Sequence, residues 1–407
     1  MKKIMLWGLG KYSDIVFASL KSDMCELVGA IDINEEKQGV LWKNKFEVIS
    51  PEKIPSDEID YIIVTVLHAE SIQKQINEKE IEESKVIYFW HQDVSQFEFI
   101  NPDKKEIFCL KMELEKYKNR ADNAPYEFGE YTGPIIKSSV ELLELIREKK
   151  ASLCRFGDGE FEIIFGNNRS WFQKPNNNLG ERLRNILNSE DSNIIIAIAD
   201  NYGNLDKYTE EAADAIRSYL SVGKRKQHMD LLNLDRIYYD AYVSRSYMMY
   251  KDKDNARKIF ELYGCIFEGR NILIVEGQHT KSGYKNDLFA NAKKISRILC
   301  PDCDAYLHYE EIYNSVIKNA DKETLIIISL GATATVLAYD LAREGYQALD
   351  FGQMDNEYEW YKRKCSKKEV IPGKSVSEIS WYKYPKEDEL DFEFRSQVIC
   401  EVGINGC

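Results

Sequence analysis

Short apolar runs alternate with amphipathic segments over the first hundred residues. The runs cover residues 3–9, 26–31, 60–66 and 85–90, and helical patterns separate several of them. Alternation of this kind predicts a small α/β domain built on a parallel sheet. We therefore expect a Rossmann-like domain over residues 1–100.

The pattern changes after residue 100. Residues 101–130 are highly charged, and Leu110, Met112 and Leu114 give only a weak apolar seam, so this segment is predicted to be a helical linker. A second α/β series over 131–407 predicts another Rossmann-like domain. Its expected strands are 152–156, 193–199, 271–276 and 324–330, and its expected helices are 138–149, 287–299 and 334–344.

Composition narrows the class of protein. The 407 residues are 44% hydrophobic, which is enough for two domain cores, and the net charge of −13 disfavours a broad interface with nucleic acid. No apolar run approaches the roughly 18 residues of a membrane-spanning helix, and the first residues lack a signal-peptide pattern. We expect a cytoplasmic protein, including a peripheral position at the inner face of the membrane. Homo-oligomerisation stays open.

The first predicted strand leads into a partial dinucleotide-binding motif. Gly8 and Gly10 follow the strand, and Asp32 ends the next one at the spacing of a ribose ligand. Ser13 stands where the third glycine of the motif belongs. A Rossmann-like domain without a redox cofactor is therefore favoured over one that binds a nucleotide, which remains the alternative.

Candidate chemistry lies after the strand at 152–156. On extended backbone the carboxylates of Asp158 and Glu160 would point to the same side, as one shared hard cation requires. Gly157 would let the backbone approach a phosphate, and Arg155 offers a bidentate phosphate partner. Such a sequence on its own is typical of an acidic surface turn, so its weight depends on the motifs around it.

Two further strand ends carry polar groups. The residues after strand 324–330 open a helix and offer amides and hydroxyls for a phosphate, at Gly331, Thr333 and Thr335. Strand 271–276 ends in Glu276 and leads through a loop to Asn286 and Asp287, which we expect at the start of the next helix.

Four motifs occur in a fixed order over residues 131–378: RFGDGE, SRSYMMYKDK, VEG with GYKNDLF, and LGATATVLAYDLAREGYQALDFGQMDNEYEW. This succession resembles the bacterial GT-D fold glycosyltransferases, formerly a domain of unknown function. The resemblance implies that Asp158 and Glu160 hold Mn²⁺ or Mg²⁺ with the diphosphate of a UDP-sugar. It makes Arg245 and Lys251 candidate donor or acceptor ligands. The chain departs from the family pattern at residues 278–281 and at Ala332, where proline is usual.

The predicted reaction is transfer of a hexose from a UDP-sugar to a hydroxyl of a surface glycan or glycoprotein glycan. A metal ion, Arg155 and the Thr333 loop would stabilise the departing diphosphate. An inverting transfer would also need a base, for which Glu276 and Asp287 are equal candidates. The alternative is an NAD-dependent sugar-nucleotide oxidoreductase or epimerase, suggested by the N-terminal glycines and by the spacing of Tyr247 and Lys251.

Aromatic residues between the acidic motif and Arg245 are candidate platforms for an acceptor sugar, since aromatic faces pack on the apolar faces of sugar rings. Packing in the core is the commoner role for such residues. The set comprises Trp171, Phe172, Tyr202, Tyr238, Tyr239 and Tyr242.

Overall fold

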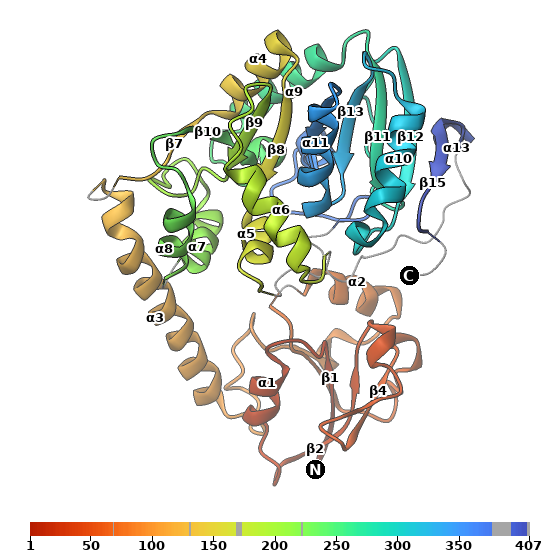
Figure 1. Cartoon of the computed structure of the whole chain (residues 1–407). Coiled ribbons are helices and arrows are strands. Elements are labelled where there is room, and N and C mark those ends of the chain that lie inside the picture. The colour runs from red at the N-terminus through yellow and green to blue at the C-terminus, as the bar shows by residue number, and fades with distance from the viewer. Residues whose placement is uncertain (68, 130–131, 168–172, 221–222, 377–391, 405–407) are drawn as a thin grey trace. The chain divides into compact units, whose positions relative to one another are not determined.

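The computed structural model describes residues 1–67, 69–129, 132–167, 173–220, 223–376 and 392–404 (Figure 1). The chain divides into two compact units, Met1–Lys118 and Asn119–Cys407. The division falls inside one helix, α3 (Pro102–Glu127), which occupies the segment predicted as a helical linker. Each unit is built on its own sheet, so the prediction of two α/β domains is confirmed.

The first unit contains a six-stranded sheet in the order β3-β4-β2-β1-β5-β6. Only the β3–β4 pair is antiparallel. The four apolar runs of the sequence form β1, β2, β5 and β6, as predicted, because their alternate side chains fill the cores on the two faces of the sheet. The elements are β1 (Lys2–Trp7), α1 (Ser13–Ser19), β2 (Cys25–Ile31), β3 (Leu41–Trp42), β4 (Phe46–Ile49), β5 (Tyr61–Val64), α2 (Glu70–Glu78) and β6 (Val86–Tyr88).

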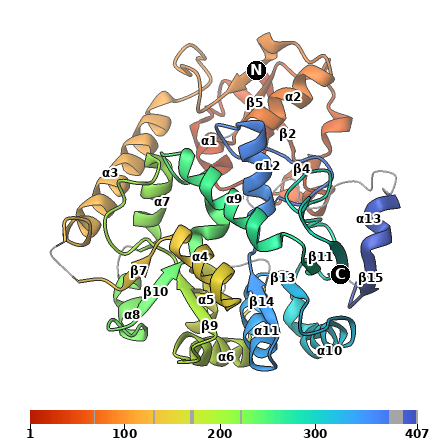
Figure 2. The ribbon, with the colours of Figure 1, turned by 90° about the horizontal axis from the view of Figure 1, so that it is seen from above.

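The second unit contains a nine-stranded parallel sheet in the order β15-β12-β11-β13-β14-β8-β9-β10-β7. Helices α4 and α9 lie on one face, and α6, α10 and α11 lie on the other (Figure 2). The strands are β7 (Ile135–Lys137), β8 (Ser152–Phe156), β9 (Ile194–Ile198), β10 (Ile237–Asp240), β11 (Asn271–Gly277), β12 (Lys294–Cys300), β13 (Leu325–Ser329), β14 (Gln347–Asp350) and β15 (Val398–Glu401). The helices are α4 (Ser139–Lys149), α5 (Asp158–Ile164), α6 (Asn177–Leu187), α7 (Glu210–Tyr219), α8 (Lys224–Leu231), α9 (Asp254–Phe267), α10 (Tyr309–Asn319), α11 (Ala332–Arg343), α12 (Met354–Arg363) and α13 (Phe392–Gln397).

The strands of this sheet are buried on both faces. In β13, Leu325 and Ile327 pack toward the face of α4 and α9, whereas Ile326 and Ile328 pack toward the face of α6 and α11. Continuous apolar runs are typical of parallel strands covered on both sides. This is why the strands at 152–156, 193–199, 271–276 and 324–330 were predictable from the sequence.

One predicted helix is wrong. The segment 287–299 forms turns followed by β12, not a helix. Its apolar residues recur near helical spacing, but β11 and β15 pair with β12 on its two sides and make it an interior strand. The partner β15 lies about a hundred residues further along the chain, so a local pattern could not reveal it.

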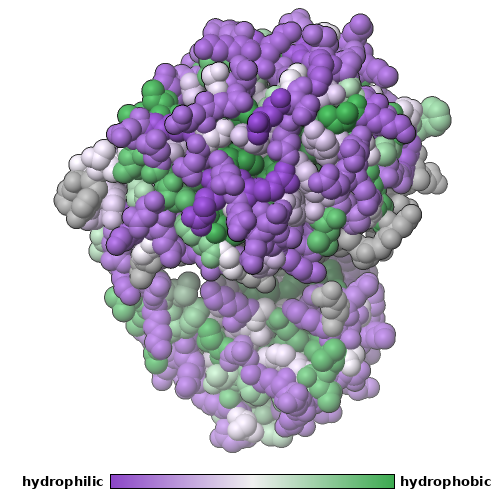
Figure 3. Space-filling model, in the orientation of Figure 1, coloured by the Kyte–Doolittle hydropathy of each residue, from purple (hydrophilic) through white to green (hydrophobic). Residues whose placement is uncertain are grey.

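No helix among the described residues has the length and hydropathy to cross a bilayer. The face shown in Figure 3 is largely hydrophilic with scattered apolar patches. Both observations agree with the hydropathy of the sequence.

Close packing of α5 on α6 gives a first prediction. A methyl group on Gly180 in α6 would lie 2.9 Å from the carbonyl oxygen of Ile163 in α5. Gly180→Ala should therefore lower the free energy of unfolding by about 1–2 kcal/mol, because overpacking outweighs the gain in helix propensity. Chemical denaturation measures this, with the exposed neighbour change Glu181→Ala as control. A more stable Gly180→Ala protein would contradict the packing described.

Candidate active site

The centre of the larger sheet is a switch point in the order of the strands. The chain passes from β8 to β9 and β10 on one side, and then returns through β11 to β14 on the other. Strands β8 and β14 meet at the centre through one pair, Leu153 and Leu349. Ligands of open parallel sheets bind in the crevice beyond the carboxyl ends of strands at such a point.

Arg155 joins the two central strands at this edge. Its Nε donates to the main-chain oxygen of Asp350 and its Nη2 donates to the Asp350 carboxylate, both at 2.7 Å. Its Nη1 donates to the hydroxyl of Ser244 at 2.7 Å. Thr335 adds a hydroxyl that lies 2.9 Å from the Arg155 carbonyl oxygen and 3.1 Å from Asp350 Oδ2. Arg155 thus acts as a clamp between β8, β14 and the loop after β10.

We expected Asp158 and Glu160 to lie on extended backbone, but they lie in a helix. Helix α5 begins at Asp158, so the two residues occupy its first and third positions and project in different directions. The Glu160 carboxylate turns back and accepts a hydrogen bond from the Gly157 amide at 2.8 Å. Asp158 is exposed at the end of β8. The strand ends at Phe156, as expected, and a helix follows at once because Gly157 and an acidic first turn favour a helix start.

Burial of the Glu160 carboxyl group raises its pKa to about 7, and the negative charge of Asp350 adds to the effect. The Gly157 amide and Arg155 act in the opposite direction but do not cancel it. A proton is therefore exchanged at Glu160 near neutral pH in the free protein.

Tyr242 lies in the same region as Asp158 and Arg245. Burial has the largest effect on the pKa of the Tyr242 hydroxyl and raises it. The negative charge of Asp158 also raises this pKa, whereas the positive charge of Arg245 lowers it. Asn201 Nδ2 donates to this hydroxyl at 3.1 Å, and Asn201 Oδ1 is buried without a partner among the described residues. The charges of Asp158 and Arg245 thus both act on the Tyr242 hydroxyl, which is hydrogen-bonded to the side-chain amide of Asn201.

A second acidic pair lies beside this group. Asp240, at the end of β10, is buried and accepts hydrogen bonds from Ser139, at 2.8 Å, and from Tyr250, at 2.9 Å. Burial raises its pKa, and the nearby charge of Asp200 adds to this. Asp200 follows β9, is partly exposed and forms an ion pair with Lys207. Sequence reasoning missed both acids, although Asp240 is the last residue of β10 and Asp200 follows β9 by two residues, and a carboxylate at a strand end is the signal that had selected Glu276.

Comparison with known proteins identifies this unit. The family model of the GT-D fold glycosyltransferases matches residues 153–379. The chain belongs to this glycosyltransferase family. Residues 1–87 match a separate family model, described as C2185-like, N-terminal.

Related proteins and structures agree with this assignment. The chain is 36% identical over 257 residues to a probable glycosyl transferase Gly of Streptococcus gordonii, covering 62% of this chain and 36% of the relative. It is 33% identical over 273 residues to the glycosyltransferase GlyD of Streptococcus pneumoniae serotype 4 (strain ATCC BAA-334 / TIGR4), covering 66% and 32%. The chain thus spans about a third of the length of these curated relatives.

Solved structures show the same fold. One is described as a new glycosyltransferase from Streptococcus sanguinis; it has a TM-score of 0.62 and 32% identity, and the match covers 66% of this chain and 99% of that one. Another is described as a highly conserved domain with a distinct glycosyltransferase fold, with a TM-score of 0.63, 32% identity and coverage of 71% and 100%. The larger unit therefore has the fold of a glycosyltransferase family, and the oxidoreductase or epimerase alternative is not retained.

The predicted phosphate loop of the glycosyltransferase is only partly accessible. Gly331 is exposed and has a φ of +54°, which favours glycine at this turn into α11. Thr333 and Thr335, by contrast, are completely buried. The hydroxyl of Thr335 is hydrogen-bonded to the Arg155 carbonyl oxygen and to the Asp350 carboxylate. Because both threonines are buried, they hold the turn in place and do not offer their hydroxyls to a ligand.

The structure places Glu276 and Asn286 inside closed polar networks. Glu276 is fully buried, forms an ion pair with Arg297 and accepts a hydrogen bond from the Ser282 amide at 2.7 Å. Asn286 donates hydrogen bonds to Asp355 and Glu359. Both of these carboxylates also form ion pairs with the buried Lys374. Neither side chain is available as a free group, because its polar atoms are used internally.

Asp287 and Lys251 are exposed. Asp287 does not cap a helix, because no helix begins there. Its carboxylate accepts hydrogen bonds from Tyr358 at 2.8 Å and from Lys362 at 3.0 Å. These contacts lower its pKa, so it is a weaker base than an ordinary aspartate.

The aromatic set is divided. Tyr202 and Tyr238 are core residues, with 3% and 0% of their surfaces exposed, so neither can stack on a sugar. Tyr239 and Tyr242 are partly exposed. Trp171 and Phe172 lie outside the described residues.

The N-terminal glycine motif serves local packing. A methyl group on Gly8 would lie 2.6 Å from a Val66 methyl group, and the φ of Gly8 is +98°. Asp32 accepts hydrogen bonds from the amides of Leu9, at 2.8 Å, and Asn34, at 2.9 Å, and pairs with Lys37. The carboxylate at the spacing of a ribose ligand is therefore used within the turn itself.

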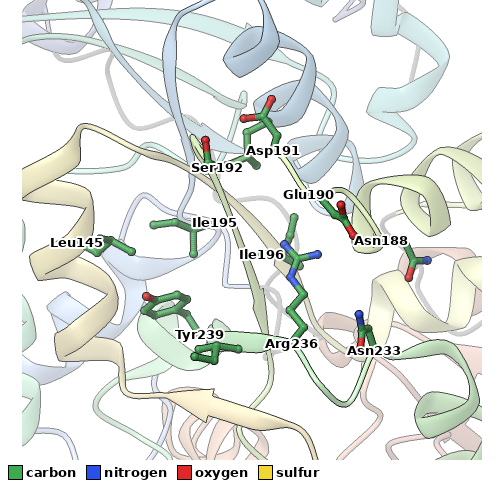
Figure 4. Close-up of a pocket in the computed structure, with 12 residues that line it drawn as sticks. Leu145, Asn188, Glu190, Asp191, Ser192, Ile195, Ile196, Asn233, Arg236 and Tyr239 are labelled. Carbon is green, nitrogen blue, oxygen red and sulfur yellow. The ribbon is translucent and has the colours of Figure 1, made fainter.

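A cavity lies away from this site. It encloses about 480 Å³ and is lined by the amino-terminal part of β9 and by β10, with Arg236 and Tyr239 at its walls (Figure 4). Here β9 and β10 have not yet begun to pair, since their ladder starts at Ala197 and Tyr239. Arg236 donates to the carbonyl oxygens of Leu187 and Ser189 and so holds the loop before β9. The cavity is on the edge opposite to Asp158.

The network around Glu276 yields a second prediction. Glu276→Leu should lower the free energy of unfolding by about 3–5 kcal/mol, because it leaves the charge of Arg297 buried without a partner. The double change Glu276→Leu with Arg297→Met should recover most of this loss and keep kcat near that of the wild type. Denaturant titration and initial rates measure both. A stable double variant without activity would restore Glu276 as a candidate base.

The raised pKa of Glu160 yields a third prediction. Between the unfolded pKa of about 4.3 and the folded pKa of about 7, the native state binds a proton that the unfolded state does not. Native stability should therefore fall as pH rises through this window, by on the order of 2 kcal/mol relative to Glu160→Gln. Thermal unfolding of both proteins in EDTA from pH 4.5 to 8 measures the difference. Parallel curves would show that the Glu160 pKa is not raised.

Proposed function

We propose that this glycosyltransferase moves a hexose from a UDP-sugar to a hydroxyl group with the help of Mn²⁺ or Mg²⁺. The observation that carries the proposal is that Asp158 is exposed at the carboxyl end of β8, at the switch point of the sheet, where its charge and that of Arg245 both act on Tyr242. A negative and a positive side chain that both act on one phenol suit a ligand that combines a metal-bound diphosphate with a polar sugar.

The acidic residues fit a divalent ion that is shared with a substrate. The described residues contain no group of three or more metal-binding side chains. Mg²⁺ is commonly held by one or two carboxylates together with substrate phosphates, without a complete protein cage. Asp158 would be the principal ligand, and Glu160 would join it only by leaving the Gly157 amide. A bound ion would neutralise charge on the diphosphate as the sugar departs.

The two arginines near the site, Arg245 and Arg155, would have different roles. Arg245 is the candidate donor ligand, since its charge acts in the same region as Asp158. Arg155 is already committed to Asp350 and Ser244, so we assign it to holding the crevice in shape. The exposed backbone at Gly331 remains a candidate phosphate contact at the start of α11.

Acceptor activation requires a carboxylate that solvent reaches. Asp200 meets this condition at the end of β9. An inverting transfer would use it as the base, because Glu276 is enclosed and the Asp287 pKa is lowered. Asn201, the next residue, would orient the sugar through Tyr242.

The acceptor is proposed to be a sugar of a surface glycan, its lipid-linked precursor or a glycoprotein, modified in the cytoplasm or at the inner face of the membrane. The family membership supports a carbohydrate acceptor, and the partly exposed ring of Tyr242 offers a face for one, whereas Tyr239 lines the cavity at the opposite edge of the sheet. Nucleic acid is not a proposed partner, given the net charge of −13.

Release of UDP from a panel of UDP-sugars with Mn²⁺ tests this proposal. Asp158→Asn should reduce kcat at least about 100-fold, since it removes charge from the metal and the diphosphate, and EDTA should abolish turnover. The exposed Asp230→Asn change is the matched control and should keep full activity. Full turnover of the Asp158→Asn protein, or turnover in EDTA, would disprove the metal assignment.

A further inference from the structure

Helix α3 carries an exposed apolar stripe. Ile107, Leu110, Leu114 and Tyr117 expose 50%, 57%, 68% and 66% of their surfaces. Their spacing of three, four and three residues places them on one side of the helix, which runs without interruption (Figure 1). Ala121 and Ala124 continue the same spacing. Large apolar side chains that share one face and remain exposed mark an interaction surface.

The opposite face of α3 is the one that packs on its own chain. Phe108 packs against Tyr12 and Trp90, with ring centroids 5.6 and 5.2 Å apart. Asn123 donates to the carbonyl oxygen of Arg217 and is 1% exposed. The stripe is therefore not the face by which α3 is held in the fold.

The spacing is that of a coiled coil. Ile107 and Leu114 take position a of a seven-residue repeat, and Leu110 and Tyr117 take position d. The first repeat has Ile107 at position a and Leu110 at position d. This combination favours a parallel coiled coil of two helices.

The flanking charges specify the partner and its direction. Glu106 and Glu113 fall at position g, and Lys111 and Lys118 fall at position e. In a parallel pair of identical helices, Glu106 faces the partner subunit's Lys111 and Glu113 faces the partner subunit's Lys118. In an antiparallel pair, glutamate would face glutamate and lysine would face lysine.

We propose that α3 is a dimerisation element, which pairs with α3 of a second copy of this chain in a parallel two-stranded coiled coil. The charge pattern matches the chain to itself, whereas an unrelated partner would need no such self-complementarity. The next g residue, Arg120, is bound to Asp214 and Glu210 of its own chain, so the charge code is carried by the repeats from Glu106 to Lys118. This inference is independent of the chemistry proposed for the transferase site.

Charge reversal tests this proposal on the full chain. The variant with Glu106→Lys and Glu113→Lys carries lysine on both sides of the stripe, and the variant with Lys111→Glu and Lys118→Glu carries glutamate on both sides. Sedimentation velocity over a concentration series should show a wild-type dimer and at least a tenfold higher dissociation constant for each variant. An equimolar mixture of the two variants should restore a mixed dimer, because every facing pair is then of opposite charge.

The matched control reverses two exposed acids at position b, with Glu115→Lys and Asp122→Lys, and should dimerise like the wild type. Circular dichroism checks that each variant is folded. A wild-type monomer at all concentrations would overturn the proposal, as would charge-reversed variants that dimerise as tightly as the wild type. To establish direction, cysteine replaces Leu110 or Tyr117 in a Cys109→Ser background. Both positions should form intermolecular disulfides in a parallel pair, and failure at both would also contradict it.

Discussion

The contact between Arg155 and Asp350 is the constraint on which the larger unit depends. Strands β8 and β14 share one ladder pair, so the two halves of the sheet are only weakly joined by main-chain hydrogen bonds. The guanidinium supplies the missing connection by binding both the carbonyl oxygen and the carboxylate of Asp350 and by reaching Ser244 after β10. The carboxyl edge at the switch point is thereby fixed in shape, and α5 starts beside it with Asp158 exposed.

Charged residues in this unit fall into two groups with different physical roles. Arg297 with Glu276, and Lys374 with Asp355 and Glu359, are buried pairs whose polar atoms are satisfied within the protein. Such pairs specify local structure, and removing one member leaves a costly buried charge. Asp158 and Asp200 reach solvent at the carboxyl edge, where a ligand can meet them. Exposure, more than residue type, separates the candidate chemistry from the scaffold.

The sequence predicted the architecture better than the site. Buried parallel strands such as β13 are continuous apolar runs, and these were read correctly, whereas β12 resembled a helix because its partner β15 is distant in the chain. The acidic motif was found, but its helical backbone was not, and Glu276 could not be recognised as enclosed until Arg297 was seen beside it. Asp200 and Asp240 become a pair only when β9 and β10 are placed side by side.

The central claim is that the donor binds in the crevice between β8 and β14. A crystal structure of the protein with UDP and Mn²⁺ tests it most directly. The account predicts anomalous density for Mn²⁺ at Asp158, with the diphosphate between the ends of these two strands and within reach of Arg245. Nucleotide bound instead in the cavity beside Arg236, or at the glycine turn of the first unit, with no metal at Asp158, would contradict the account.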